Sequence, residues 1–498
     1  MPVSGQIKIV VIADIHHERN ESAVSSSRRT EIADILFLRA VHRINRMIRP
    51  DITVILGDIQ NAPTLPDGLK QLEQLRETAS LLKSPWLIIP GNHDVPPDQF
   101  YSIFPKPDET TDLNGVRLLP FLDPDEPGLN AARSGRDLTR MRQARAGWHG
   151  QIITLQHVPV FPPGRTNCPY NHVNADEIIK VMRQNGIVLA ISGHYHDGFK
   201  MIDDDGLCFL TAPALCKPPF SFLEIDLAHD QITVTQHDLR LPEKLNLWDM
   251  HTHTQFAYCS ENMNVLKSMR LAQDFGLAGL TFTEHSGQLY FDNNTYWSQT
   301  CLAEGIASAQ KQNERMESYL AALNTAGCRP VNIGLEVDCC YDGRLLARPP
   351  DCDRVTYLLG SIHGLAAMKN PQVDPDAVGD EFLAMVSRLV RSDIDVLAHP
   401  FRVFSRSPFK IPESLYDPVI GLLKKSGVAA EINFHTQTTD PEFVRRCLAA
   451  GVKLAFGSDA HNLYEIGEFA PHLALLRDCG FDGDLNEILL NPGLSPSP

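Results

Sequence analysis

Short apolar runs alternate with amphipathic stretches along the first half of the chain. Apolar positions recur at spacings of three and four over residues 31–48 and 69–82, which is typical of helices with one buried face. The runs between them are rich in Val, Ile and Leu, so we expect buried strands at 8–13, 52–56, 86–90, 152–156 and 187–192. This alternation predicts an α/β layered domain. Residues 100–147 show little regular pattern, and we expect a loop region there.

The second half repeats strand-like and helical stretches. Residues 241–244 separate it from the first half and are too few to act as a long flexible tether. Beyond them we expect seven strands, at 247–251, 278–283, 331–336, 355–361, 394–398, 428–433 and 453–457. Helices are expected between most of them, at 265–275, 304–326, 377–391, 412–425 and 442–450. Repeated strand and helix units predict a parallel barrel, here with seven strands instead of the usual eight.

Residues of the kinds that bind metals follow all five first-half strands. They are Asp14, His16, Asp58, Asn92, His93, His157, His194 and His196. Ligands of an open α/β sheet bind at the carboxyl ends of its strands, so we expect one site. Carboxylate, imidazole and amide groups together suit manganese, iron or zinc, and Asp58 is the natural bridge between two ions. Two such cations can clamp a phosphoryl group, and His93 is placed to protonate the leaving oxygen.

The order of these residues resembles a known family. Asp-Ile-His, Gly-Asp, Gly-Asn-His-Asp, a later His and Gly-His-Tyr-His follow the pattern of the calcineurin-like metallophosphoesterases. The resemblance implies an αββα sandwich over residues 1–243. Within it, the irregular segment at residues 100–147 is a candidate for a loop region that covers the substrate. It implies that one metal is held by Asp14, His16, Asp58 and His196, and the other by Asp58, Asn92, His157 and His194. The ending Gly-His-Tyr-His-Asp looks most like the branch that includes cyclic-nucleotide and glycerophosphodiester hydrolases.

Each second-half strand also ends in candidate ligands. In chain order these are His251, His253, Glu284, His285, Glu336, His363, His399, Glu431, Asp459 and His461. The active site of a parallel barrel forms at the carboxyl ends of its strands. We therefore expect these residues to converge on one mouth.

This second set resembles the PHP family, named for polymerase and histidinol phosphatase. The blocks that carry it are His-x-His, Thr-Glu-His, Gly-Leu-Glu, Ser-Ile-His, Leu-Ala-His-Pro and Gly-Ser-Asp-Ala-His. The resemblance implies a distorted (β/α)7 barrel over residues 246–498 that holds two or three metals. It implies one site of His251, His253, Glu336 and Asp459, a second that Glu336 bridges to His363 and His399, and a third at His285 and His461. Where the family often supplies another histidine, this chain has Cys259, which is either a metal-binding thiolate or a buried structural cysteine.

Further polar residues near these blocks have two interpretations each. Arg402 either clamps phosphate with its guanidinium or forms a surface salt bridge. Glu431 either orients a ligand imidazole or is a solvated strand end. Lys217 and Arg165 are candidates for binding phosphate at the first site.

Composition limits the partners. The net charge of −16 disfavours a nucleic-acid partner, because binding a polyanion requires a basic surface. No run approaches the ~20 apolar residues of a membrane helix, and the first residues lack a charged and then apolar leader, so we expect a cytoplasmic protein. The eleven cysteines are odd in number and lack Cys-x-x-Cys spacing, which argues against a disulfide framework and a thiolate zinc site. The sequence leaves the oligomeric state open.

Together the two resemblances imply a metal-dependent phosphoesterase with two hydrolytic sites. A diesterase leaves a monoester that a phosphatase can cleave, so we expect sequential action on small phosphorylated metabolites or nucleotides, including a diester or cyclic phosphate. Two alternatives stay open. One is a nuclease acting on single-stranded nucleic acid, against which the acidic charge counts. The other is a protein in which one half is active and the other is a regulatory or scaffold domain, against which the complete ligand sets count.

Overall fold

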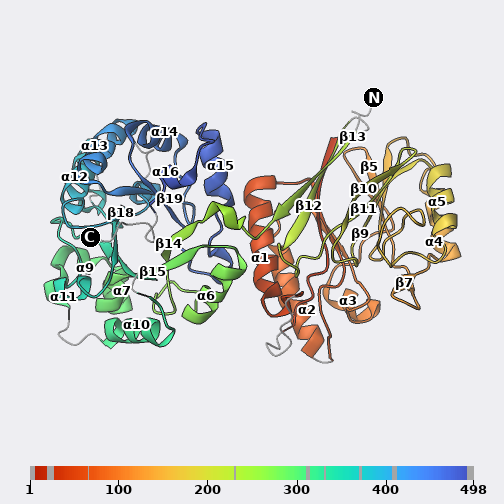
Figure 1. The fold of residues 1–498 in the computed structure, drawn as a ribbon, viewed down its shortest axis with the longest axis horizontal. Coiled ribbons are helices and arrows are strands. Elements are labelled where there is room, and N and C mark those ends of the chain that lie inside the picture. Colours follow the sequence, from red (N-terminus) through yellow and green to blue (C-terminus); the bar gives the residue numbers. More distant parts are fainter. Residues whose placement is uncertain are drawn as a thin grey trace. The chain divides into compact units, whose positions relative to one another are not determined.

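The computed structural model describes residues 6–18, 27–64, 67–228, 231–309, 314–329, 332–369, 373–406 and 412–490. The chain divides into two compact units, Met1–Arg240 and Leu241–Pro498 (Figure 1). Within the described ranges, no helix is long and apolar enough to cross a membrane.

Two sheets pack face to face in the first unit. One has the strand order β13-β12-β1-β2-β3, with bounds Gln231–Asp238, Ser221–Ala228, Gln6–Ile12, Ile52–Leu56 and Trp86–Ile89. The other has the order β10-β11-β9-β8-β5-β4, with bounds Phe199–Asp204, Leu207–Thr211, Ile187–Ser192, Gln151–Leu155, Val116–Pro120 and Thr111–Leu113. Their facing side chains form one apolar core, in which Val11 and Val54 belong to the same cluster as Ile153 and Leu189.

Helices cover the outer faces of both sheets. α1 (Ala33–Arg43) and α2 (Asp67–Ser80) lie beside the first sheet, and α4 (Gly135–Gln143) and α5 (Ala175–Gln184) lie beside the second (Figure 1). The apolar face of α5 supplies Ile178 to the core under the second sheet. These four layers are the αββα sandwich that the sequence predicts.

Parallel strands in each sheet bring carboxyl ends to a common edge. β1, β2 and β3 run parallel to one another, and β8 runs parallel to β9. Every residue of β2 is buried, as expected for a strand covered on both faces. All five strands expected in this half are present.

The expected loop region at residues 100–147 is wrong for much of its length. It contains β4, β5 and α4, the end of α3 (Pro97–Ile103), and a small hairpin of β6 (Asp125–Glu126) and β7 (Asn130–Ala131). Val116 and Leu118 of β5 are fully buried, and β5 pairs with β8 in parallel. These elements are too short to produce a periodic pattern, and only their pairing with β8 identifies β5 as a core strand.

A buried ion pair anchors the hairpin of β6 and β7 to the second sheet. Arg133 donates from Nε to Asp123 Oδ1 at 3.0 Å and from Nη2 to Asp123 Oδ2 at 2.7 Å. His172 Nε2 lies 2.9 Å from the same Oδ2 atom, and Arg133 also reaches Gln156 Oε1 at 3.2 Å. Burial opposes the ionisation of Asp123, but Arg133 and His172 hold its pKa well below the usual range.

A seven-stranded parallel sheet forms the second unit. Its order follows the sequence, β14-β15-β16-β17-β18-β19-β20, with bounds Trp248–Thr252, Gly279–His285, Ile333–Asp338, Tyr357–Ser361, Val396–Leu397, Ala429–Asn433 and Leu454–Gly457. An isolated parallel bridge between Thr252 and Ala460 joins the last strand to the first. The backbone N of Asp459 donates to His251 O at 2.8 Å, and the N of His253 donates to Ala460 O at 3.1 Å. This seam closes the predicted distorted (β/α)7 barrel.

Helices surround the barrel, at Val265–Asp274 (α6), Glu314–Thr325 (α10), Pro375–Leu389 (α12), Tyr416–Ser426 (α13) and Pro441–Ala450 (α14). The single helix expected at 304–326 is wrong. α9 (Thr300–Glu304) ends at Gly305, which has φ +75°, and α10 begins only at Glu314. Residues 310–313 of that expected helix, and residue 331 of an expected strand, lie outside the described residues.

Replacing Asp123 with asparagine should destabilise the first unit by about 3–5 kcal/mol, because it leaves the Arg133 guanidinium buried without a full counter-charge. The matched control is Asp112→Asn, which removes an exposed partner of Arg117 and should cost less than about 1 kcal/mol. Urea unfolding followed by tryptophan fluorescence measures both. Because the pKa of Asp123 is depressed in the folded protein, the stabilisation is complete above about pH 4 and is lost on further acidification. Equal costs for the two variants would contradict this account.

Candidate functional site

The first cluster lies where both sheets of the first unit end their parallel strands. β1, β2 and β3 supply residues from one sheet, and β8 and β9 supply residues from the other. The structure brings together all eight residues expected there, which are Asp14, His16, Asp58, Asn92, His93, His157, His194 and His196. Neither sheet alone carries the whole set.

Asp58 lies at the centre of this cluster. Its Oδ2 atom is 3.5 Å from His16 Nε2 and 3.3 Å from His157 Nε2. His16 Nε2 is 3.0 Å from His196 Nε2, which in turn lies 3.6 Å from Asp14 Oδ1. One carboxylate therefore joins two groups of nitrogen and oxygen atoms, as a bridging ligand would.

Backbone carbonyls orient the imidazoles on the far side of Asp58. His157 Nδ1 lies 2.6 Å from Leu56 O, and His194 Nε2 lies 3.0 Å from Leu129 O, so each ring donates to a carbonyl. The opposite nitrogens, His157 Nε2 and His194 Nδ1, are 3.2 Å apart and direct their lone pairs into the cluster. Asn92 Oδ1 lies 3.1 Å from His157 Nε2.

His93 occupies the open side of the cluster. Its backbone N donates to Asp58 Oδ1 at 2.8 Å, and its Nδ1 atom lies 2.6 Å from Asn61 O. Among the described residues, no hydrogen bond engages the His93 Nε2 atom. The His93 ring lies 4.8 Å from the His16 ring, measured between centroids, and lines a pocket of about 220 Å³.

Several cluster residues have left-handed backbone conformations. φ is +55° at Asp14, +50° at His16, +51° at Asp58 and +66° at His194. Such angles are uncommon for residues other than glycine and persist where surrounding structure enforces them, which is frequent at active sites. Here the paired ends of strands β1, β2 and β9 hold the backbone in place. The strained turns that follow them direct the side chains toward the cluster.

Position 91 requires glycine, because the backbone there lies very close to Asp58 and His157. A Cβ atom there would lie 2.2 Å from Asp58 Oδ1 and 2.7 Å from His157 Cε1. The loop is held in place by Asp94, which accepts hydrogen bonds from Gly91 N at 2.8 Å and Gln60 N at 2.9 Å. The sequence places Asp94 in the Gly-Asn-His-Asp block but assigns it no separate role, and the structure shows that it holds this loop.

Neighbouring groups in this cluster have pKa values that are shifted in different directions. Burial raises the pKa of Asp14 and opposes the charge of Asp58, but His157 and the other imidazoles hold the pKa of Asp58 below its usual range. Burial lowers the pKa of His194 to about 4 and that of His196 to about 3, so both rings are neutral and retain lone pairs. His157 differs, because burial opposes its charge but Asp58 and Asp14 raise its pKa to about 10. Two buried carboxylates together with several imidazoles are a donor set that fits divalent cations.

Two pockets flank the first cluster. The pocket of about 220 Å³ is lined by Arg28, Tyr170 and Tyr195 besides His93. A second pocket of about 460 Å³ borders Asn92 and His157, and its other walls include Val95, Pro96, Phe121 and Leu122. The two expected phosphate-binding cations are each paired with an aspartate, and the partner of Lys217, Asp197, itself lines the pocket of about 220 Å³. Lys217 pairs with Asp197, and Arg165 Nη1 lies 3.1 Å from Asp204 Oδ1.

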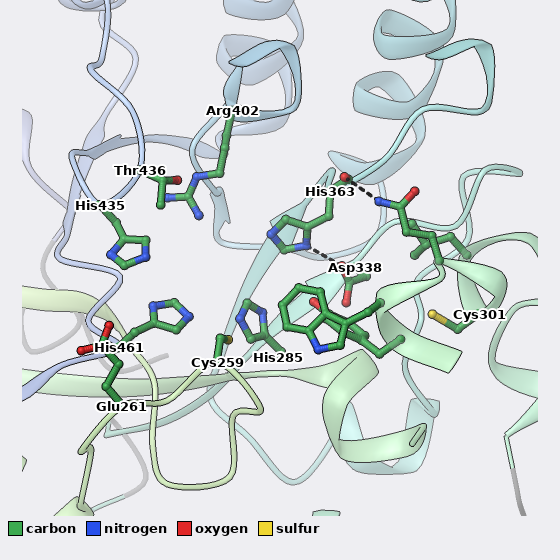
Figure 2. A pocket seen from close by; sticks show the side chains of 14 residues that line it. Cys259, Glu261, His285, Cys301, Asp338, His363, Arg402, His435, Thr436 and His461 are labelled. Atoms are coloured by element: carbon green, nitrogen blue, oxygen red, sulfur yellow. Dashed lines mark hydrogen bonds and ion pairs between the residues drawn. The ribbon is translucent and has the colours of Figure 1, made fainter. Parts of the chain in front are cut away.

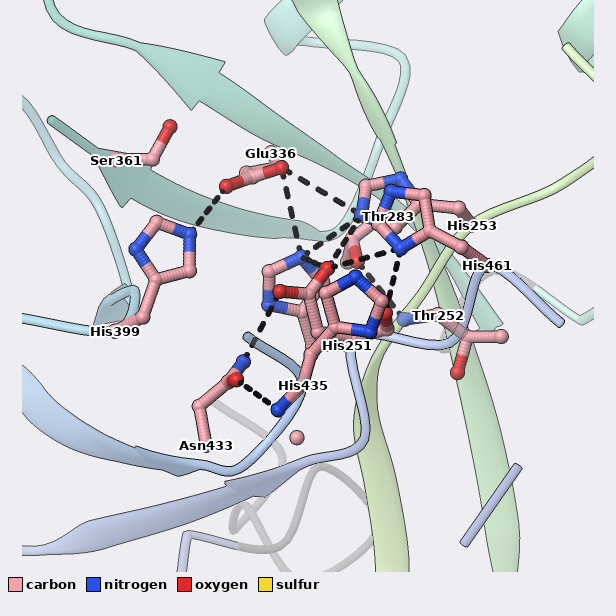
Figure 3. Close-up of polar contacts among 12 residues, drawn as sticks. His251, Thr252, His253, Thr283, Glu336, Ser361, His399, Asn433, His435 and His461 are labelled. Carbon is pink, nitrogen blue, oxygen red and sulfur yellow. Dashed lines mark hydrogen bonds and ion pairs between the residues drawn. The ribbon is translucent and has the colours of Figure 1, made fainter. Parts of the chain in front are cut away.

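Glu336 is the centre of the second cluster, at the barrel mouth (Figure 3). Its side chain is fully buried. Oε1 lies 2.8 Å from His399 Nε2 and 3.3 Å from His363 Nε2. Oε2 lies 2.6 Å from His285 Nδ1 and 3.5 Å from His251 Nε2. Residues from five successive strand ends thus meet on one carboxylate.

Asp459 completes the cluster across the barrel seam. Its Oδ1 atom is 2.9 Å from His253 Nε2 and 3.4 Å from His251 Nε2. Buried carboxylates hold the outer nitrogens of both rings, since His251 Nδ1 lies 2.8 Å from Glu431 Oε1 and His253 Nδ1 lies 3.1 Å from Glu284 Oε1. Glu431 also accepts from His399 N at 2.6 Å. It therefore orients imidazoles, and the interpretation of a solvated strand end is wrong.

The residues of the third expected metal site lie around His253. This ring stacks on His285 with centroids 4.0 Å apart, and His253, His285 and His461 each place a nitrogen within 4.8 Å of the others. Cys259 lines the same pocket as His285 and His461 (Figure 2). Its Sγ atom accepts from Gln288 Nε2 at 3.4 Å, and burial raises the pKa of Cys259 to about 12.

Arg402 is buried, so a surface salt bridge is the wrong description. Its Nη2 atom contacts Asp459 Oδ2 and donates to Asn433 Oδ1 at 2.7 Å. The guanidinium lines the mouth pocket, which has a volume of about 290 Å³. His435, also in this pocket, stacks on His461 at 4.5 Å.

Sequence reasoning missed three contributors to the second cluster. Asp338 Oδ1 lies 2.5 Å from His363 Nδ1, and its position two residues after Glu336 on the same strand face was an available signal. His435 Nδ1 lies 2.9 Å from Glu465 Oε1. Nothing in the sequence pattern pairs those two residues, because they lie on different loops.

The pKa shifts at the barrel mouth are also consistent with a binding site for cations. Burial opposes the charge of His251, but Asp459, Glu431 and Glu336 raise its pKa well above the usual value. Burial and His253 instead lower the pKa of His461 to about 2. Glu336 Oε2 is buried without a hydrogen-bond donor among the described residues, although ring nitrogens surround it. A carboxylate oxygen facing several imidazole nitrogens matches the donor set of divalent metals.

Comparisons with known proteins agree with this division. The model of the calcineurin-like phosphoesterases matches residues 7–198, and the model of the PHP domain matches residues 249–435. A protein from Acetivibrio thermocellus named "Probable phosphatase" is 26% identical over 145 residues, which cover 28% of this chain and 55% of that protein. A "Probable histidinol-phosphatase" from Deinococcus radiodurans is 27% identical over 261 residues, which cover 47% of this chain and 94% of that protein.

A solved structure of a dimetal phosphatase from Danio rerio is also similar, with 15% identity and a TM-score of 0.40, covering 47% of this chain and 96% of that one. The chain spans about half of the Acetivibrio protein and nearly all of the Deinococcus protein. The first match contains all eight residues of the first cluster, and the second match contains the second cluster up to His435, with Asp459 and His461 beyond its end. The chain is a fusion of an N-terminal calcineurin-like phosphoesterase domain with a C-terminal PHP domain.

Proposed function

We propose that this protein is a metal-dependent phosphoesterase with two hydrolytic sites, acting on small phosphorylated metabolites or nucleotides. The observation that carries the proposal is the pair of buried carboxylates, Asp58 and Glu336, each surrounded by imidazoles at the ends of parallel strands. Both domain families consist of phosphoesterases or include phosphatases, and two separate clusters imply two reactions.

In the N-terminal site we assign two metals of the manganese, iron or zinc type. Asp14, His16, Asp58 and His196 would hold one, and Asp58, Asn92, His157 and His194 would hold the other. When bound, such ions neutralise phosphate charge and lower the pKa of water. His93 delivers a proton to the leaving oxygen from Nε2, because its Nδ1 atom is engaged by Asn61 O.

The two pockets beside the N-terminal cluster support a diester substrate. One ester arm lies on the side of His93, Tyr170 and Tyr195, and the other on the apolar side of Pro96, Phe121 and neighbouring residues. A monoester needs only one such pocket. The hairpin of β6 and β7 borders this cleft through Leu129, which agrees with a substrate-covering role for part of residues 100–147.

In the C-terminal site we assign two or three metals. His251, His253, Glu336 and Asp459 would hold one, His363 and His399 with Glu336 would hold a second, and His285, His461 and Cys259 would hold a third. Arg402 positions Asp459 and presents its guanidinium to the phosphate. The same pocket is also lined by Tyr296 and Trp297, which suit a small substrate with a flat group.

Sequential action follows from this pairing. The diester site produces a phosphomonoester, and the phosphatase site releases its phosphate. Bis-p-nitrophenyl phosphate tests the order, because its first cleavage gives p-nitrophenol and p-nitrophenyl phosphate, and the second gives p-nitrophenol and phosphate.

His93→Ala should slow the first cleavage by roughly 10²- to 10⁴-fold, because it removes the proton donor to the leaving oxygen. His363→Ala should instead allow p-nitrophenyl phosphate to accumulate. Stopped assays with manganese that quantify all three products measure both effects. His149→Ala, which alters an exposed histidine outside both clusters, is the control. Loss of both cleavages in one variant and of neither in the other would exclude sequential action.

Gly91→Ala should weaken manganese binding at the first cluster by roughly 10- to 100-fold, because the new methyl group must displace Asp58. Calorimetric titration in a Glu336→Gln background confines the measurement to that cluster. The matched control is Gly135→Ala, since a Cβ atom there meets nothing within 4 Å and lies in the first turn of α4. Identical manganese affinities in the two alanine variants would show that Asp58 does not bind the metal.

A further inference from the structure

Arg28 faces the N-terminal cluster from a segment that no sequence motif marks. The segment lies between the loop after β1 and α1, and two backbone hydrogen bonds hold it in place. Arg29 N donates to Cys216 O at 2.8 Å, and Glu18 N donates to Thr30 O at 3.1 Å. The Arg28 side chain lines the pocket of about 220 Å³ together with His93 and His196.

The guanidinium of Arg28 has no recorded partner in the part of the chain that the structure describes. Among the described residues it forms no ion pair or side-chain hydrogen bond, including none with Asp14 or Asp58. Neighbouring cations are neutralised, since Arg29 Nε lies 2.7 Å from Glu31 Oε1 and Lys217 pairs with Asp197. A guanidinium has five N–H donors in a planar fork that matches phosphate oxygens, so its free donors in this pocket suit an anion.

The Arg28 side chain lies close to the cluster, since it lines the same pocket as Asp58, His194 and His196. Divalent cations at the cluster would add to the positive potential. A cationic side chain without a carboxylate partner is stable next to such a centre when an anion binds between them.

We propose that Arg28 binds the non-bridging oxygens of the substrate phosphate in the N-terminal site, on the side where His93 meets the leaving group. This inference rests on the proposed phosphoesterase function. It replaces Arg165 and Lys217 as the phosphate-binding cations, because both of those are paired with aspartates. The ligand class is a phosphate ester or inorganic phosphate, held by a planar pair of donors.

The test compares full-length Arg28→Ala and Arg28→Lys in a Glu336→Gln background, which silences the C-terminal cluster. The control is Arg165→Ala, which removes an exposed guanidinium paired with Asp204. Inorganic phosphate binding to manganese-loaded protein is measured by isothermal titration calorimetry, metal content by mass spectrometry, and KM and kcat with bis-p-nitrophenyl phosphate.

Arg28→Ala should weaken phosphate binding and raise KM by about tenfold or more with unchanged metal content. Arg28→Lys should recover part of the loss, because lysine keeps the charge but not the fork. Arg165→Ala should match the parent.

Unchanged phosphate affinity in Arg28→Ala, or an equal loss in Arg165→Ala, would overturn the proposal. Loss of metal in both Arg28 variants would also overturn it, since the guanidinium would then support the cluster and not the substrate. A parent protein that binds phosphate but cleaves no ester would disprove the proposed function, while calorimetry would still decide the role of Arg28.

Discussion

Two buried carboxylates, Asp58 and Glu336, set the conditions that the rest of the molecule satisfies. Each is almost or completely inaccessible to solvent, with exposed fractions of 1% and 0%. An ionised carboxylate in such a place is strongly unfavourable unless opposite charge or hydrogen-bond donors surround it. The chain meets this requirement by ending several parallel strands around each carboxylate. In the first unit two sheets contribute, and in the second a closed barrel does. The fold is thus arranged so that strand ends from distant parts of the sequence deliver imidazoles to one oxygen pair.

Orientation matters as much as proximity in both clusters. Near Asp58, the rings of His157 and His194 are fixed by main-chain carbonyls, those of Leu56 and Leu129. Near Glu336, three rings are fixed by other carboxylates, which are Glu431 for His251, Glu284 for His253 and Asp338 for His363. A carbonyl fixes a tautomer without adding charge, whereas a carboxylate also makes the ring a stronger ligand. The barrel mouth therefore carries more negative charge than the sheet edge, which agrees with its larger expected number of metals.

The sequence predicts most of this arrangement, for a definite physical reason. Strand runs are visible through their apolar patterns, and residues that follow a strand reach the same sheet edge, so the residues around Asp58 and Glu336 could be named. The contacts that could not be predicted join segments that lie far apart in the sequence, so no local sequence pattern marks them. The carbonyl of Leu129 is identical to any other carbonyl in the sequence, and it reaches His194 only because a small hairpin is held by Arg133 and Asp123. His435 pairs with Glu465 across two loops. The prediction of one continuous helix at residues 304–326 is wrong because Gly305 interrupts an otherwise amphipathic stretch.

The two arginines beside the clusters, Arg402 and Arg28, differ in how far neighbouring side chains neutralise their charge. Arg402 is already neutralised by Asp459 and Asn433, so its charge chiefly fixes a ligand carboxylate, and an incoming phosphate must meet a site whose charges are largely balanced. Arg28 has no such partner among the described residues, so its charge remains available. A diester carries one negative charge and interacts weakly with metals alone, whereas a monoester dianion interacts strongly. An additional free guanidinium is therefore most valuable at the diester site. A neutralised one suffices at the monoester site, where substrate charge itself supplies the attraction.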